Sequence, residues 1–280
     1  MRLLVFAIVT ALILAAACKR IQTPTPDLNV AQVKELTLDP TASVWDNVPL
    51  HASKMILQDL VEPRQMEVTT PEVQVKAITD GTEIVFRLEW PDTTKNDMPG
   101  PKQFIDGCAV QLPAKSDPIV PAPQMGETGK TVEISFWRAD WQATVEGRAD
   151  NINSLYPNAL IDTYPSEAGP LKNDPQAQSE AALRYAPARA LGNRRSGPRD
   201  QPVEDLIAEG PSTLSPAPNA ISKGKGVRTD KGWSVVISRP IPNGFSATNP
   251  SQIAFAVWEG SHVEVGARKM RTGWVQMIMK

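Results

Sequence analysis

Histidine and cysteine, the residues that most often carry catalytic or metal chemistry, are scarce in this sequence. It holds two of each in 280 residues. No Cys-x-x-Cys-His stretch occurs, which excludes covalent c-type haem attachment, and the scarcity of both residue types excludes zinc-finger and Cys-ligated iron–sulfur sites. His51 and His262 occur without a Gly-x-Ser-x-Gly stretch, so a Ser-His-acid hydrolase is not expected. His262 follows Trp258-Glu259-Gly260 and is interpreted as a loop histidine.

Tryptophan is the unusual residue type, with seven Trp against three Tyr and six Phe. Trp137 and Trp141 flank Arg138-Ala139-Asp140 at the end of an apolar run. They could form a platform on which a sugar ring stacks, or they could belong to a hydrophobic core. The core is favoured because large aromatic side chains dominate protein interiors. Gly224 and Gly226 form a Gly-x-Gly pair that follows no predicted strand, so nucleotide binding has no support.

The amino terminus is predicted to be an export signal. A basic start, an apolar run over residues 3–14 and small residues 15–17 precede Cys18. The run is too short to span a bilayer, and a cysteine after small residues resembles a bacterial lipobox. We expect residues 1–17 to be a lipoprotein-type signal peptide, Cys18 to be lipidated, and residues 18–43 to tether a domain at the periplasmic side of a bacterial membrane. The alternative is ordinary cleavage that leaves Cys18 unmodified.

Lipidation of Cys18 leaves Cys108 without an intramolecular disulfide partner. Cys108 lies in an apolar stretch, residues 104–110. Its simplest role is that of a small buried hydrophobic residue.

Composition and charge predict a soluble globular body that does not bind nucleic acid. Hydrophobic residues make up 41% and charged residues 21%, and the formal net charge is −2, so counterion release cannot drive binding to DNA or RNA. The 26 prolines and 17 glycines interrupt the chain too often for long helices. These features favour an all-β body with long irregular loops.

Alternation of apolar and polar residues predicts short strands within a single domain over residues 44–280. Helices are expected at 176–185, which is Ala- and Glu-rich, and at 202–209, which begins with proline and ends before glycine. The remainder of 145–231 is expected to be a Pro-rich loop. The predicted fold is a β-sandwich of two mainly antiparallel sheets with long Pro-rich loops and a few short helices. Its strands are predicted at residues 73–79 and 82–90 (a hairpin through Asp80-Gly81), 108–112, 131–137, 233–238, 252–258 (placed centrally) and 273–279.

Several segments, taken together and in order, resemble the haem-binding gamma subunits of ethylbenzene dehydrogenase and related type II dimethyl sulfoxide reductase-like molybdoenzymes. The resemblance extends over most of residues 45–280. The segments are residues 104–113, 125–127, 132–141, 185–193, 202–210 with 213–214, and 254–260 continuing to 266–269.

This resemblance implies one non-covalent b-type haem per chain with Met125 and Lys269 as its axial ligands. Thioether sulfur is a soft ligand that favours ferrous iron, and lysine must lose its proton to bind a metal, which burial promotes. Without the resemblance, Met125 would be interpreted as a gap-filling loop residue and Lys269 as part of a solvated basic cluster.

The resemblance also implies a non-catalytic electron-transfer subunit, because a six-coordinate haem has no open position for a substrate. Its expected partners are a molybdopterin catalytic subunit, an iron–sulfur subunit, and a soluble c-type cytochrome or quinone-linked carrier. Two alternatives stay open at this point: an exported carbohydrate-binding sandwich that uses Trp137 or Trp141, and a lipoprotein scaffold without a cofactor.

Overall fold

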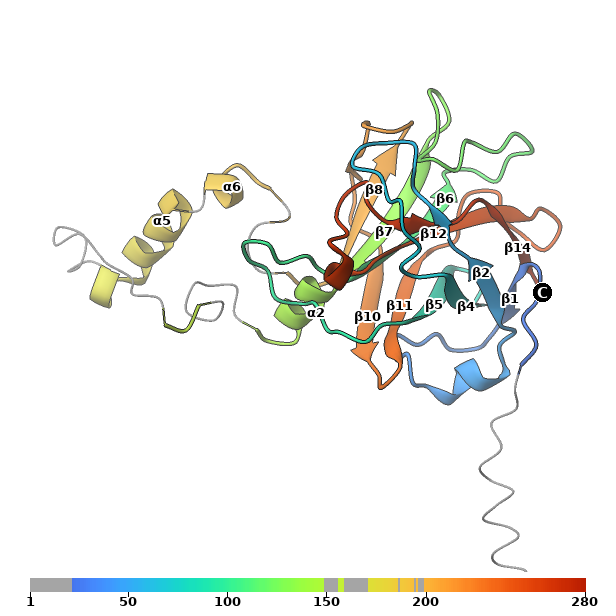
Figure 1. The fold of residues 1–280 in the computed structure, drawn as a ribbon, viewed down its shortest axis with the longest axis horizontal. Helices are drawn as coiled ribbons and strands as arrows, with labels where there is room; N and C mark the ends of the chain where they lie inside the picture. The colour runs from blue at the N-terminus through green and yellow to red at the C-terminus, as the bar shows by residue number, and fades with distance from the viewer. Residues whose placement is uncertain (1–21, 149–155, 159–170, 186, 194, 196–198) are drawn as a thin grey trace, which may run out of the picture.

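The structure is a computed structural model, and it describes residues 22–148, 156–158, 171–185, 187–193, 195 and 199–280 (Figure 1). The predicted signal peptide and Cys18 lie outside the described residues. The described helices are α2 (Ala139–Val145), α5 (Pro175–Tyr185) and α6 (Pro187–Ala190), with short 3-10 helices η1 (Ser43–Asn47) and η2 (Gly260–His262). None of the described helices is long and apolar enough to cross a membrane.

Strands form the rest of the framework. In chain order they are β1 (Leu28–Gln32), β2 (His51–Lys54), β3 (Ile56–Leu57), β4 (Glu72–Thr79), β5 (Glu83–Pro91), β6 (Gly107–Pro113), β7 (Val132–Arg138), β8 (Val203–Ala208), β9 (Ser215–Pro216), β10 (Lys223–Arg228), β11 (Gly232–Pro240), β12 (Ser251–Trp258), β13 (Met270–Arg271) and β14 (Val275–Met279).

The strands form two layers that are joined through β12. The hydrogen-bonded order is β10-β11-β5-β4-β1-β14-β12-β6-β7-β8-β9. Residues 251–253 of β12 pair with β14 in the first layer, and residues 254–258 pair with β6 in the second. Only β1 forms parallel pairs among the described strands, with β4 and with β14. The predicted β-sandwich of mainly antiparallel sheets is therefore confirmed, as one continuous sheet folded into two layers.

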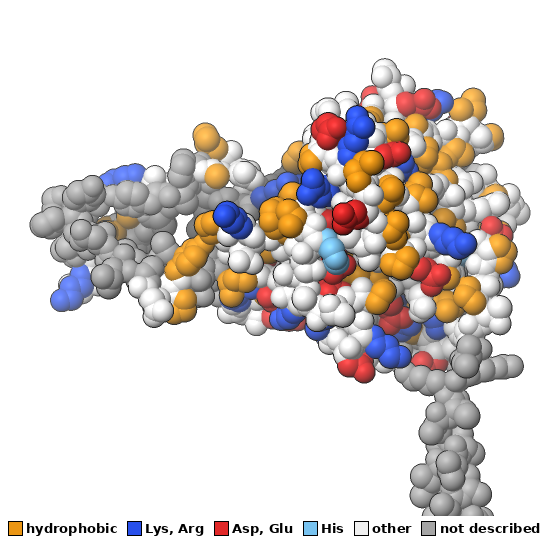
Figure 2. All heavy atoms as spheres, in the orientation of Figure 1, with side chains coloured by type: hydrophobic (Ala, Val, Ile, Leu, Met, Phe, Trp, Pro, Cys, Tyr) orange, Lys and Arg blue, Asp and Glu red, His pale blue; other side chains and the backbone are white. Residues whose placement is uncertain are grey.

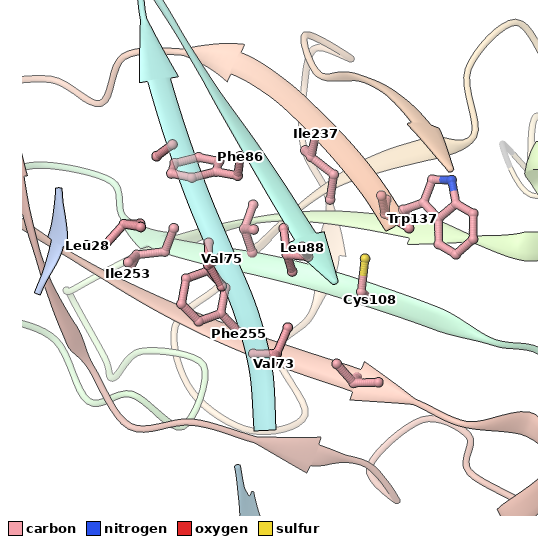
Figure 3. Close-up of a cluster of buried hydrophobic side chains, with 14 of the residues drawn as sticks. Leu28, Val73, Val75, Phe86, Leu88, Cys108, Trp137, Ile237, Ile253 and Phe255 are labelled. Atoms are coloured by element: carbon pink, nitrogen blue, oxygen red, sulfur yellow. The ribbon is translucent and has the colours of Figure 1, made fainter. Parts of the chain in front are cut away.

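The main hydrophobic core lies between the two layers (Figure 3). Phe86 and Leu88 of β5 face it from the first layer, and Cys108 of β6 and Trp137 of β7 face it from the second. All four are fully buried. The structure thus confirms the predicted burial of Cys108, and burial raises the pKa of its thiol above the ordinary value.

The Gly-x-Gly pair of β10 provides space for this core. A Cβ atom at Gly226 would lie 2.2 Å from the indole ring of Trp137, and one at Gly224 would lie 2.5 Å from the side chain of Val203. The Gly226 N–H also donates to Gln142 Oε1 at 2.8 Å, which accepts the Trp137 indole N–H at 3.2 Å. These glycines therefore let β10 approach the second layer closely.

Every predicted strand is present, and the hairpin of β4 and β5 pairs Gln74 with Glu89 through Thr79 with Ile84. The predicted helix at 176–185 is confirmed as α5, which lies to one side of the sandwich together with α6 in Figure 1. On the face shown in Figure 2, basic, acidic and apolar side chains are interspersed over the sandwich.

The predicted helix at residues 202–209 is wrong, because this segment forms β8, which pairs with β7 along six residues. Pro202 at its start and Gly210 after its end suggested a helix, but the acidic residues of the segment have tertiary partners in the sandwich. Asp205 accepts hydrogen bonds from Ser135, Ser222 and the Ile221 N–H. Strands β9 and β10 likewise occupy part of the expected 145–231 loop.

The predicted tether over residues 18–43 is also wrong for residues 28–32. These residues form β1, whose Leu28 and Val30 are fully buried in the main core. The sandwich therefore begins before the predicted boundary at residue 44. The segment is too short for an alternation of apolar and polar residues to be recognised beside the surrounding prolines. Its extended conformation comes from pairing with β4 and β14.

Candidate functional site

A cavity of about 550 Å³ lies on the outer face of the second layer. Alternation along β6 sends Cys108 and Val110 into the main core and Ala109 to the cavity. Ala256 of β12 pairs directly with Ala109 and also lines the cavity. These short side chains leave room above the sheet, and loops at residues 58–62, 103–105, 123–125, 211–214 and 264–269 surround that room.

The cavity wall is mainly apolar. Ile134 and Phe136 from β7, Leu206 from β8 and Trp258 from β12 line it. The Phe136 and Trp258 rings are tilted against each other with centroids 4.8 Å apart. The cavity volume falls within the roughly 300–1,000 Å³ typical of ligand pockets, and such pockets combine apolar walls with a few polar groups.

Met125 reaches the cavity from a tightly held turn. Its φ of 68° is left-handed, and that of the following Gly126 is 81°. A left-handed non-glycine residue costs roughly 1 kcal/mol or more and persists only when the surroundings enforce it. Here the Gly210 N–H donates to the Met125 carbonyl oxygen at 2.7 Å. A side chain at position 126 would approach the Lys130 carbonyl oxygen within 2.7 Å, so glycine is required there.

Side chains from β6 and from the connection between β13 and β14 fix the loop that leads to Met125. Gln111 Nε2 donates to the Pro123 carbonyl oxygen at 2.9 Å, and the Trp274 indole N–H donates to that of Pro121 at 2.7 Å. The Met125 side chain packs against the apolar cluster beneath the cavity. The thioether is therefore carried on a loop that is bonded to the sheet at several points.

Lys269 lines the same cavity from the connection before β13. Its Nζ lies 5.0 Å from the centre of the Trp258 ring, and no carboxylate pairs with it among the described residues. Burial, with a smaller contribution from the positive charge of Arg271, lowers the pKa of Lys269 from 10.5 to about 8. The side chain is half-buried because it faces the cavity, yet the surrounding protein desolvates the amine. This lysine loses its proton far more readily than a surface lysine.

The loop that carries Lys269 is held by two side chains. Gln58 Nε2 donates to the carbonyl oxygens of Ala267 and Val61, at 3.1 and 2.8 Å. The Trp258 indole N–H donates to the Gly266 carbonyl oxygen at 3.0 Å. Trp258 thus both supports the lysine amine with its ring and anchors the preceding turn.

Neither histidine lines the cavity. His51 is buried in β2, where its ring nitrogens bond the Thr25 carbonyl oxygen and the Ser53 hydroxyl. His262 is exposed in η2, in agreement with its interpretation as a loop residue, and its Nδ1 lies 3.0 Å from Glu259. The structure therefore brings Met125 and Lys269 to one cavity and leaves both histidines outside it.

Neither tryptophan considered for sugar stacking presents an open ring face. Trp137 is fully buried in the main core, and Trp141 is only 5% exposed. The guanidinium groups of Arg199 and Arg138 lie 3.8 and 4.9 Å from the centre of the Trp141 ring. The preference for a core role is confirmed for Trp137.

Sequence reasoning missed several residues of this site. Gln58, Trp258 and Arg271 hold or line the cavity, and Glu264 lines it as a carboxylate that is only 1% exposed. Burial raises the pKa of Glu264, whose oxygens accept hydrogen bonds from Gln65, Thr69 and the Glu259 N–H. The alternation of Lys269, buried Met270 and Arg271 was the one signal in the sequence that could have placed Arg271 beside Lys269.

Comparison with known proteins places the chain in a family. A family model described as ethylbenzene dehydrogenase matches residues 42–270, which is most of the chain. The chain belongs to the ethylbenzene dehydrogenase family. The match spans Met125 and Lys269 and nearly all of the sandwich, so the resemblance expected from the sequence is confirmed.

Two curated relatives of this chain are named as subunits of reductases. A respiratory nitrate reductase haem subunit from Haloferax mediterranei is 23% identical over 242 residues, which cover 84% of this chain and 66% of the relative. The chlorate reductase subunit gamma of Ideonella dechloratans is 23% identical over 250 residues, which cover 85% of this chain and 78% of the relative. This chain thus spans just under two thirds of the first relative. The first name specifies a haem subunit, and the second specifies a gamma subunit.

Solved structures match only distantly. A family 9 carbohydrate-binding module from Caldicellulosiruptor kristjanssonii in complex with glucose has a TM-score of 0.40 and 10% identity, over 90% of this chain and 95% of that one. The same module in complex with cellotriose has the same TM-score, over 90% of this chain and 93% of the module. A likeness this weak does not bear on what the chain binds.

Proposed function

We propose that this chain is an electron-transfer subunit that holds one non-covalent haem b in the cavity above the second layer, with Met125 and Lys269 as axial ligands. The observation that carries the proposal is the meeting of these two side chains, far apart in the sequence, at one apolar cavity. Membership of the ethylbenzene dehydrogenase family and the haem subunit named among its relatives support it.

The donor set of the cavity fits a haem. A thioether sulfur and a neutral amine can both ligate iron, and the lowered pKa of Lys269 reduces the cost of producing the neutral amine. The strained turn at Met125 would hold the sulfur in place. Phe136, Leu206 and Trp258 supply apolar contact for a flat hydrophobic ring system. When bound, a haem would supply a one-electron ferric/ferrous couple.

Two protein ligands would leave no open coordination position, which restricts the chain to electron transfer. Its proposed partners are a molybdopterin catalytic subunit and an iron–sulfur subunit, together with a soluble c-type cytochrome or a quinone-linked carrier. The reductase subunits named among the relatives support this assembly. We further propose that the chain is exported and that a lipid on Cys18 anchors it at the periplasmic side of the membrane.

Reconstitution with haem tests the cofactor. The purified protein should take up close to one haem per chain, lose it to acidified organic solvent, and give a b-type pyridine haemochrome spectrum, because no Cys-x-x-Cys-His stretch can attach it covalently. A folded protein that takes up no haem would refute the proposal.

Single substitutions test the ligands. Lys269→Ala and Met125→Ala should each open one axial position, so that the low-spin spectrum becomes high-spin and carbon monoxide binds the reduced form. Met125→Ala should also lower the midpoint potential, since the thioether favours ferrous iron. His51→Ala and His262→Ala are the matched controls and should keep the wild-type spectrum. A low-spin spectrum that survives Lys269→Ala but is lost in His262→Ala would make His262 the ligand.

A further inference from the structure

Among the described residues, three arginines line the cavity, and two of them are neutralised by nearby carboxylates. Arg138 forms a two-point pair with Asp140, with nitrogen–oxygen distances of 3.0 and 2.9 Å. Arg195 Nε and one of its terminal nitrogens both lie 2.8 Å from Glu204 Oε2. These two guanidinium groups therefore already have strong anionic partners within the protein.

Arg271 is different. Its ion-pair partner, the Asp59 carboxylate, lies 4.0 Å away, at the limit of an ion pair. The Asp59 side chain is 56% exposed, whereas that of Arg271 is only 13% exposed. The Arg271 Nε is buried and has no hydrogen-bond partner among the described residues. A buried guanidinium with such weak pairing is costly unless another anion meets it.

The placement of Arg271 directs it toward the occupant of the cavity. Met270 of β13 points into the main core, and the residues on either side of it, Lys269 and Arg271, both line the cavity. Pairing of Arg271 with Ala256 of β12 and with Ile56 of β3 fixes its backbone on both sides. The guanidinium therefore lies on the same wall as the proposed lysine ligand and on a hydrogen-bonded strand.

We propose that Arg271 binds a carboxylate of the molecule held in the cavity, which for haem b is a propionate. This inference rests on the proposed function. A guanidinium presents donors in a planar fork that matches a carboxylate, and the pair is strongest where water is excluded. The lining carboxylates Glu62 and Glu264 have other partners: Glu62 pairs with Arg64 at 2.9 Å, and the oxygens of Glu264 accept hydrogen bonds from Gln65, Thr69 and the Glu259 N–H.

The test compares protohaem with its dimethyl ester, in which both propionates are esterified and uncharged. Each is titrated into the haem-free protein, and the dissociation constant is taken from the absorbance change. The wild-type protein should bind protohaem about tenfold or more tightly than the ester, the effect of one charge-assisted hydrogen bond. Arg271→Gln should lose most of this preference and keep the low-spin spectrum, because both axial ligands are intact.

Two matched variants separate propionate binding from a structural role of Arg271. Asp59→Asn removes the weak ion pair but leaves the guanidinium, and should retain the wild-type preference for the free acid. Arg138→Gln removes a cavity arginine that already has a carboxylate partner, and should retain it as well. If Arg271→Gln does not fold, Arg271→Lys keeps the charge without the fork and should show a reduced preference.

The outcomes also distinguish this inference from the proposed function. A wild-type protein that binds neither protohaem nor its ester would overturn both. Low-spin binding of protohaem and ester with equal affinity by the wild type would overturn the role of Arg271 alone. A preference for the free acid that is unchanged in Arg271→Gln would also overturn the role of Arg271 alone.

Discussion

Replacing Lys269 with methionine should stabilise the haem-free protein at neutral pH, although the change removes a proposed ligand. Methionine is similar in length and apolar, so it fills the same space without a charge to desolvate. Burial lowers the pKa of Lys269 from 10.5 to about 8. At about 1.4 kcal/mol per pKa unit, the charged lysine costs the folded state roughly 3 kcal/mol.

This cost depends on pH in a defined direction. Below pH 8 the lysine is protonated in both the folded and unfolded chain, and the folded state bears the full cost. Between pH 8 and 10.5 the unfolded chain retains a proton that the folded protein has released, so the wild-type free energy of unfolding rises with pH. Above pH 10.5 the amine is neutral in both states and the cost disappears.

Urea unfolding of the haem-free proteins at pH 7 and near pH 10.5 measures the effect. Lys269→Met should raise the free energy of unfolding by up to about 3 kcal/mol at pH 7, with most of that gain lost near pH 10.5. Lys54→Met, at an exposed position of β2, is the control and should change stability by less than about 0.5 kcal/mol. A Lys269→Met protein that is no more stable than wild type at pH 7, or a gain that is independent of pH, would refute the argument.

Three further predictions concern the core, the lysine loop and the amino terminus. Gly226→Ala should lower the free energy of unfolding by about 1–3 kcal/mol, because the added Cβ would overlap Trp137. Gly273→Ala is the control and should not lower it, because the space around Gly273 is open. Equal urea midpoints for the two variants would contradict this prediction. Trp258→Ala should weaken the low-spin haem spectrum more than Trp258→Phe, because phenylalanine keeps a ring beside Lys269 and loses only the hydrogen bond to Gly266. An unchanged spectrum in both variants would exclude a positioning role for Trp258. Cys18→Ser should abolish lipid labelling and release the protein from membranes, and a wild-type amino terminus without lipid mass would disprove the anchor.

The sequence by itself determined where most strands lie. Alternating burial has a period of two in any sheet, so a run such as residues 82–90 shows its strand without knowledge of its neighbours. The same local pattern made Cys108 a buried residue and Asp80-Gly81 a hairpin turn. Family resemblance added Met125 and Lys269, which no spacing rule would have connected.

Only the tertiary structure decided which segments pair and where the cavity opens. Pro202 and Gly210 suit the start and the end of a helix in isolation, but pairing with β7 and the hydrogen bonds to Asp205 outweigh that preference. Gly226 is explained by the ring of Trp137, from a distant strand. The weak pairing of the Arg271 guanidinium likewise depends on what surrounds it in space. A local sequence pattern gives the period of an element and therefore its type. Burial, strand pairing and pKa depend on residues that are remote in the chain, and these residues become neighbours only when the two layers pack together.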